Sequence, residues 1–88
     1  MFFVYILECS DGKFYVGFTE DFNARLCRHN HGEVKFTSSR LPVNVKVVIE
    51  LPDKYVALKT EDYLKSGSGR AFALKHLLRR QDFRRPDL

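Results

Sequence analysis

The stretch that most constrains the fold runs from Lys13 to Asn30, where an extended segment passes directly into a helix. Residues 14–18, Phe-Tyr-Val-Gly-Phe, are rich in aromatic and β-branched side chains and favour a strand. Thr19-Glu20-Asp21 is typical of a helix start, and Phe22 and Leu26 follow at the i,i+4 spacing of one helix face. We therefore expect a helix over about residues 20–30 that begins where the strand ends.

An earlier extended run determines how two tyrosines meet. Residues 2–9 are apolar on both faces, as in a central strand covered above and below. The turn Ser10-Asp11-Gly12 permits two registers. A two-residue loop would place Tyr5 and Tyr15 on opposite faces, whereas a three-residue loop closed by a left-handed glycine pairs Tyr5 with Gly17 and puts both tyrosines on one face. We predict the second register, which leaves a vacancy at Gly17 where something other than protein could sit.

The remainder of the chain predicts one more strand and two more helices. Residues 45–51 form a β-rich run, which we expect beside the first strand, and residues 33–41 are expected to form a basic loop. Pro52-Asp53 opens a helix that ends at Lys65, and Ser68 caps a last helix from Arg70 to about Gln81. The predicted fold is α+β: a small three-stranded antiparallel or mixed sheet flanked by about three helices, in the order ββα-β-αα.

Composition limits the class of protein. At 88 residues the chain suffices for one domain, expected over residues 1–88 with a core at about 2–78 and a basic tail at about 82–88. Fifteen Lys and Arg against eleven Asp and Glu give a net charge of +4, which favours an anionic partner. Two cysteines are too few for a disulfide framework and suit the cytoplasm. The apolar run at residues 2–7 is too short to span a membrane, so no membrane partner is expected.

Glu61 is the most informative single residue. Its helical spacing puts the carboxylate in the middle of the apolar stripe made by Ala57, Leu58 and Leu64. Removing a carboxylate from water costs several kcal/mol unless a cation compensates. Arg25 and His29 border the packed face of their own helix. The compensating cation would be Arg25, a metal ion, or both. A structural ion pair between Glu61 and Arg25, or a side chain bent towards solvent, is the alternative.

Five spaced elements together resemble a known family. Val4-Tyr5-Ile6, Tyr15-Val16-Gly17, Arg25, His29 and Glu61 occur in the order of the GIY-YIG nucleases, over roughly residues 2–78. The chain is most similar to the small stand-alone members of that family. It also resembles the N-terminal nuclease domain found in excinuclease ABC, a DNA repair enzyme.

The resemblance implies a metal-dependent, structure-selective endonuclease acting on nucleic acid, with DNA favoured. Tyr5, Tyr15, Arg25, His29 and Glu61 would be catalytic. Glu61 would hold the metal, Arg25 would clamp phosphate, the tyrosines would surround the nucleophile, and His29 would transfer a proton or contact phosphate. Gly17 would be the close-approach glycine. The metal would be Mg²⁺, with Mn²⁺ as substitute, because such sites need only one or two carboxylates. The sequence leaves open which tyrosine is the base.

The basic segment supports a second interpretation. Lys35, Thr37 and Arg40 offer donors suited to phosphate, so we expect them to bind nucleic acid. Many family members carry an asparagine after the catalytic glutamate, and this chain has none beyond Asn44. The alternative is therefore a catalytically weak or inactive nucleic-acid-binding or accessory domain of the same fold. In either case, a partner protein could confer specificity.

Overall fold

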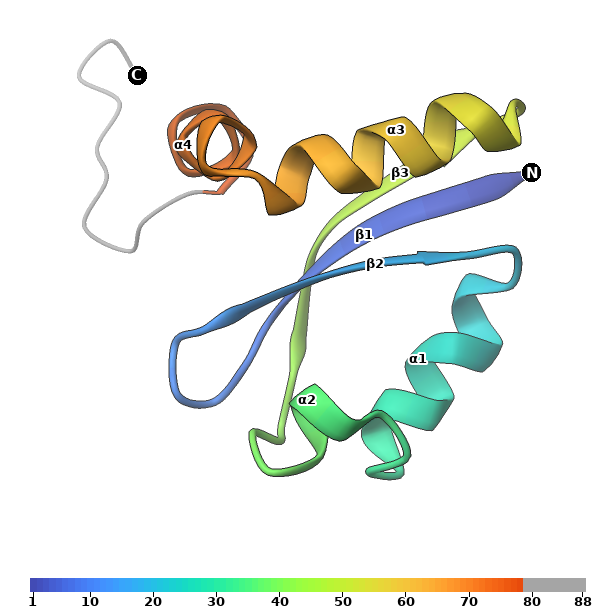
Figure 1. The fold of residues 1–88 in the computed structure, drawn as a ribbon. Coiled ribbons are helices and arrows are strands. Elements are labelled where there is room, and N and C mark those ends of the chain that lie inside the picture. Colours follow the sequence, from blue (N-terminus) through green and yellow to red (C-terminus); the bar gives the residue numbers. More distant parts are fainter. Residues whose placement is uncertain (79–88) are drawn as a thin grey trace, which may run out of the picture.

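A three-stranded antiparallel sheet lies between two pairs of helices (Figure 1). The computed structural model describes residues 1–78. Strand β1 (Phe2–Glu8) is central, with β2 (Phe14–Thr19) on one side and β3 (Asn44–Leu51) on the other. The predicted α+β class, the ββα-β-αα order and the place of the third strand beside the first are confirmed. Strand β2 is therefore an edge strand of the sheet.

The hairpin register is the one predicted from the three-residue loop. Tyr5 pairs with Gly17, and Leu7 pairs with Tyr15. The Cys9 amide donates to the Lys13 carbonyl at 2.8 Å, and Gly12 adopts a φ of 85°. A glycine tolerates this left-handed conformation without the clash that a Cβ would cause. Both motif tyrosines therefore lie on one face of the sheet.

The opposite face carries the core and is covered by α3 (Lys54–Lys65) and α4 (Gly67–His76). Val4 and Ile6 of the central strand pack against Ala57 and Leu64 of α3 and Ala73 of α4. Asp53 caps α3 by accepting from the Val56 amide at 3.2 Å. Glu61 therefore lies on a helix that packs against the face of the sheet opposite the tyrosines.

Helix α4 begins earlier than the sequence suggested. Ser66, rather than Ser68, is its N-cap and accepts from the Gly69 amide at 3.1 Å. Gly69 does not break the helix: α4 crosses α3 so closely that a Cβ at this position would overlap the Tyr63 carbonyl. Helix α4 also ends earlier than expected, at His76 with Leu77 as its C-cap rather than at about Gln81. The basic tail expected at 82–88 lies outside the described residues.

The tyrosine face is covered by α1 (Phe22–Asn30) and α2 (Lys35–Ser38). Asp21 caps α1 through the Ala24 amide at 3.1 Å, so only two residues separate the last residue of the strand from the first residue of the helix. Helix α2 corrects the expectation of a loop over residues 33–41. Within residues 1–78, no helix is long and apolar enough to cross a membrane.

Candidate active site

Tyr5 and Tyr15 form the floor of the candidate site. Their ring centroids lie 6.1 Å apart, as the hairpin register requires. Tyr5 is fully buried, with the edge of its ring against Phe22 at 5.4 Å between centroids. Tyr15 is half-buried and lines a cleft over β2. Tyr15 therefore borders the cleft, whereas Tyr5 does not.

His29 joins the two tyrosines to α2. It is the buried residue of α1, and its Nε2 lies 2.9 Å from Tyr5 Oη while its Nδ1 lies 2.7 Å from Thr37 Oγ1. The Tyr15 ring meets the imidazole edge-on at 4.9 Å between centroids. Thr37 was expected on a phosphate-binding surface, but its side chain is fully buried, so its hydroxyl serves His29 instead.

Gly17 has a different role from the one expected. The space above it is not open to a ligand, because the Tyr5 ring lies directly over the backbone. A Cβ at Gly17 would overlap Tyr5 Cζ and Oη and would press on the Tyr15 ring. The close approach that requires a glycine is therefore that of the motif tyrosines themselves.

The charges of Arg25 and Glu61 both act on Tyr5, one from α1 and the other from α3. Burial and the neighbouring Tyr15 raise the pKa of Tyr5 to about 12. The Arg25 guanidinium lowers the pKa of Tyr5, and the Glu61 carboxylate raises it. Both charges therefore act on the same phenol, from helices that cover opposite faces of the sheet (Figure 1).

The imidazole of His29 is held neutral by its surroundings. Burial lowers the pKa of His29, and the positive charges of Arg25 and Arg28 lower it further. A neutral imidazole has one nitrogen with a free lone pair, so it can accept a proton.

Glu61 of α3 has a lysine as its ion-pair partner among residues 1–78. Its side chain is only 17% exposed, and its Oε2 is 2.9 Å from Lys65 Nζ. Among residues 1–78, no ion pair within 4 Å joins Glu61 to Arg25, and no cluster of three His, Cys, Asp or Glu side chains forms a protein-only metal cage. A single carboxylate suits Mg²⁺, which keeps most of its waters, and the exposed Lys65 can turn away from it.

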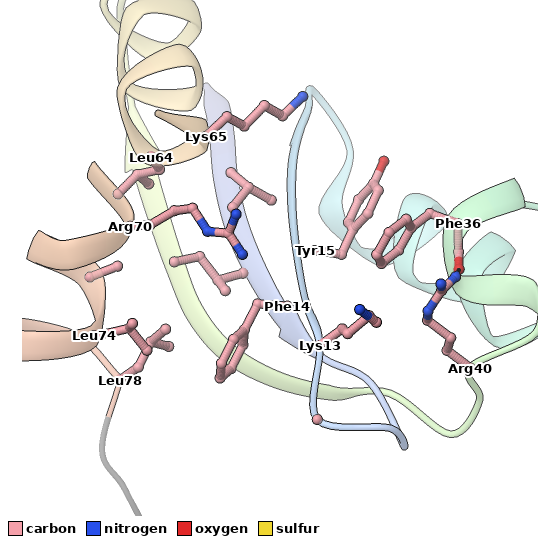
Figure 2. A pocket seen from close by; sticks show the side chains of 14 residues that line it. Lys13, Phe14, Tyr15, Phe36, Arg40, Leu64, Lys65, Arg70, Leu74 and Leu78 are labelled. Carbon is pink, nitrogen blue, oxygen red and sulfur yellow. Dashed lines mark hydrogen bonds between the residues drawn. The ribbon is translucent and has the colours of Figure 1, made fainter. Parts of the chain in front are cut away.

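A cleft of about 560 Å³ extends over the edge strand beside this site. Lys65 and Arg70 line it from the α3 and α4 side, and Phe36 and Arg40 line it from the α2 side (Figure 2). Lys13 of the hairpin lies between them. Reasoning from sequence did not identify Lys13, Lys65 or Arg70, because isolated cations carry no pattern until the fold gathers them.

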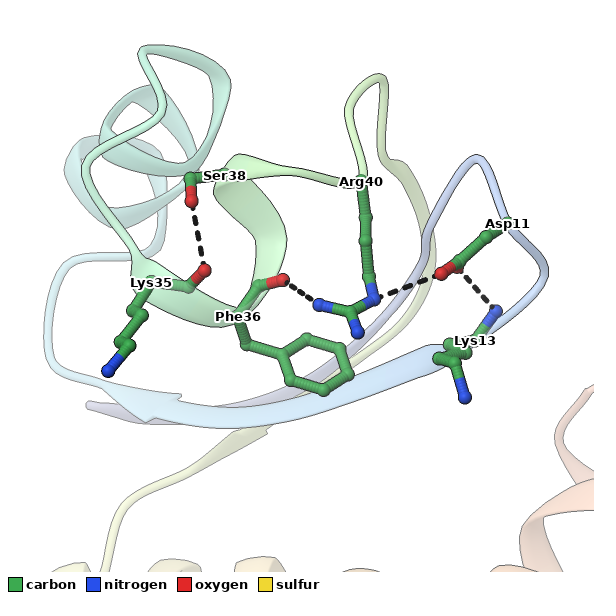
Figure 3. A network of polar contacts seen from close by, with 6 residues as sticks. All are labelled: Asp11, Lys13, Lys35, Phe36, Ser38 and Arg40. Atoms are coloured by element: carbon green, nitrogen blue, oxygen red, sulfur yellow. Dashed lines mark hydrogen bonds and ion pairs between the residues drawn. The ribbon is translucent and has the colours of Figure 1, made fainter.

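The two basic residues expected to bind nucleic acid differ in their surroundings. Lys35 is exposed. Arg40 instead pairs through Nε with Asp11 at 2.9 Å, donates to the Phe36 carbonyl at 2.7 Å, and stacks on the Phe36 ring at 4.2 Å (Figure 3). Arg40 therefore ties the hairpin tip to α2, and only part of its guanidinium is free for phosphate.

Known proteins are similar to this chain in sequence and fold. The family model described as GIY-YIG catalytic domain matches residues 1–75. A UPF0213 protein of Lacticaseibacillus paracasei is 43% identical over 65 residues, which cover 73% of each chain. Another, from Streptococcus sanguinis, is 40% identical over 70 residues, covering 78% of this chain and 80% of that one. The solution NMR structure of a UPF0213 protein from Bacillus halodurans matches with a TM-score of 0.55 at 33% identity, covering 85% of this chain and 84% of that one. The chain therefore belongs to the GIY-YIG family.

Proposed function

We propose that this protein is a divalent-metal-dependent endonuclease that hydrolyses phosphodiester bonds in DNA. It would recognise the structure of the DNA rather than its base sequence. The observation that carries the proposal is the buried contact of Tyr5 with His29, acted on by the charges of Arg25 and Glu61. Phosphodiester hydrolysis needs a metal ligand, a proton acceptor and a fixed cation, and these residues supply one of each.

Glu61 is the proposed metal ligand, with Mg²⁺ or Mn²⁺ as the ion. When bound, the ion would lower the pKa of a coordinated water and neutralise charge on the phosphate. Arg25 is the proposed phosphate clamp, because a guanidinium presents several donors in a planar fork that matches phosphate oxygens. Lys13, Lys65 and Arg70 would contact the flanking phosphates along the cleft.

His29 is the proposed final acceptor of the proton lost by the attacking water. With a pKa of about 12, Tyr5 is phenolate in roughly one molecule in 10⁵ at pH 7, so it cannot act as a standing base. It can instead take the proton of water at Oη while passing its own proton to His29 Nε2. The phosphorus–oxygen bond to water forms, the bond to the leaving oxygen breaks, the leaving oxygen takes a proton from solvent, and His29 later returns one to solvent.

Access distinguishes the roles of the tyrosines. Tyr15 borders the cleft, so we assign its hydroxyl to the substrate side. Tyr5 is fully buried, so we assign its hydroxyl to the relay that passes a proton to His29.

The second candidate is a binding or accessory domain with little chemistry, and the cations of the cleft favour it as much as they favour a nuclease. Both functions place the protein with nucleic acid, and a partner protein that adds specificity fits a domain of this size. A cytoplasmic location fits its free thiols, Cys9 and Cys27.

Cleavage of labelled DNAs separates the two candidates. A panel of branched, single-stranded and linear duplex substrates is incubated with wild type and with Glu61→Ala, in Mg²⁺, in Mn²⁺ and in EDTA. A nuclease cleaves at least one substrate only with metal and only with Glu61 present. Binding of the same substrates without metal-dependent products would support the accessory domain.

A further inference from the structure

His29 is held by one hydrogen bond at each ring nitrogen. Nε2 lies 2.9 Å from Tyr5 Oη, and Nδ1 lies 2.7 Å from Thr37 Oγ1, with all three side chains fully buried. A neutral imidazole carries a proton on only one nitrogen, and the partner of that nitrogen must accept while the partner of the other donates. The two hydroxyls therefore decide which nitrogen is protonated.

Two proton arrangements are conceivable, and only one gives every proton an acceptor. If Thr37 donated to Nδ1, His29 would donate from Nε2 to Tyr5, and the proton of Tyr5 would find no acceptor among residues 1–78, where His29 Nε2 is the hydrogen-bond partner of Tyr5 Oη. If Thr37 instead donates to the Val34 carbonyl, which lies 3.4 Å away, its oxygen accepts from Nδ1–H. Tyr5 then donates to the lone pair of Nε2. The second arrangement leaves no donor of this buried group without a partner.

We infer that Thr37 is a positioning residue that holds His29 in the tautomer protonated at Nδ1, which keeps Nε2 free to accept the proton of Tyr5. This inference rests on the proposed function only where it concerns catalysis. The tautomer itself is a property of the free protein. Thr37 would act through His29 and would touch neither substrate nor metal.

The fold gives Thr37 a fixed position for this task. Helix α2 is only four residues long, and Arg40 ties it to the hairpin. The Arg40 guanidinium donates to the Phe36 carbonyl at 2.7 Å and to Asp11 at 2.9 Å (Figure 3). The Thr37 side chain points inward, with its Oγ1 at 2.7 Å from His29 Nδ1.

Nuclear magnetic resonance of the ring nitrogens tests the inference without substrate or metal. Nitrogen-15 shifts of His29 are compared in wild type, Thr37→Ser, Thr37→Val and the control Ser38→Ala, whose hydroxyl lies on the same helix but does not contact His29. We expect the Nδ1-protonated form in wild type, Thr37→Ser and Ser38→Ala, and a shift towards the Nε2-protonated form in Thr37→Val. An Nε2-protonated wild type, or an unchanged tautomer in a folded Thr37→Val, would overturn the inference. If Thr37→Val does not fold, the wild-type spectrum alone decides.

Cleavage kinetics add a second readout. Loss of an outer hydrogen-bond partner typically costs roughly 10- to 100-fold in activity, so Thr37→Val should lower kcat by that factor while KM changes little. Thr37→Ser should restore most of the rate. If wild type does not cleave DNA, the nuclease proposal fails while the tautomer result still stands. If Thr37→Val cleaves like wild type despite a changed tautomer, the positioning role is refuted.

Discussion

Replacing Gly17 by alanine tests the packing on which the whole site depends. The added Cβ would overlap Tyr5 Cζ and Oη, and the Tyr5 ring cannot move freely because Phe22 and His29 enclose it. Overpacking a buried site costs about 1–3 kcal/mol, and loss of the Tyr5–His29 hydrogen bond adds about 1 kcal/mol. The sum, about 2–4 kcal/mol, corresponds to a fall in Tm of roughly 10–30 °C for a domain of this size.

Thermal unfolding followed by circular dichroism measures this effect, with Gly67→Ala as the matched control. A Cβ at Gly67 meets nothing within 4 Å, and alanine is the better helix former, so the control should be equal to wild type or slightly more stable. Gly17→Ala should also cleave more slowly at a temperature where it is fully folded. A Gly17→Ala protein with the Tm and the cleavage rate of wild type would refute the packing argument.

Three further predictions concern the residues around the tyrosines. Burial lowers the pKa of His29, so the unfolded chain binds a proton at this residue more readily than the folded protein does. The free energy of unfolding should therefore be at its full value above about pH 6.5 and fall as the pH drops towards the lower pKa of the folded state. Urea midpoints that do not fall from pH 7.5 to 5 would contradict this. Tyr5→Phe should lower kcat and remove the fall in rate at low pH that comes from protonation of His29. Tyr15→Phe should retain that fall. Lys35→Ala should reduce the slope of log affinity against log salt by about 0.9 on duplex DNA, and an unchanged slope would remove Lys35 from the interface. Arg40→Ala should instead lower Tm, because Arg40 ties the hairpin to α2.

The hairpin and the sheet could be predicted because their signals are local. The loop Ser10-Asp11-Gly12 has the glycine that a left-handed turn position needs, and closing it as a three-residue loop gives the observed register of Tyr5 and Tyr15. Glu61 could likewise be singled out, because a carboxylate inside an apolar helical stripe conflicts with the pattern around it. Its partner was missed: Lys65 lies at the i,i+4 spacing of a helical ion pair, a local signal that was overlooked in favour of Arg25 or a metal ion.

Helix α2 and the start of α4 depend on tertiary contacts that leave no trace in the local pattern. Val34 precedes α2 without a side-chain cap, and four residues are too few to show a helical period. Gly67 and Gly69 suggested a break before α4, but the close crossing over Tyr63 is what makes a glycine necessary at position 69. The contact of Thr37 with His29 arises in the same way, from a turn that brings α2 beside the end of α1.

Separating cleavage from binding in Glu61→Gln tests the central claim most directly. Glutamine keeps the shape of the side chain but binds a divalent ion poorly, and Lys65, which is 53% exposed, can be solvated when it loses its partner. The free energy of unfolding should therefore change by less than about 1 kcal/mol. The exposed Asp62→Asn, next along α3, is the control for loss of one negative charge. We predict that Glu61→Gln binds DNA with nearly the wild-type Kd but loses metal-dependent cleavage by at least about 100-fold, while Asp62→Asn retains both. Full cleavage by Glu61→Gln, or its unfolding with no metal-dependent activity in wild type, would contradict the assignment.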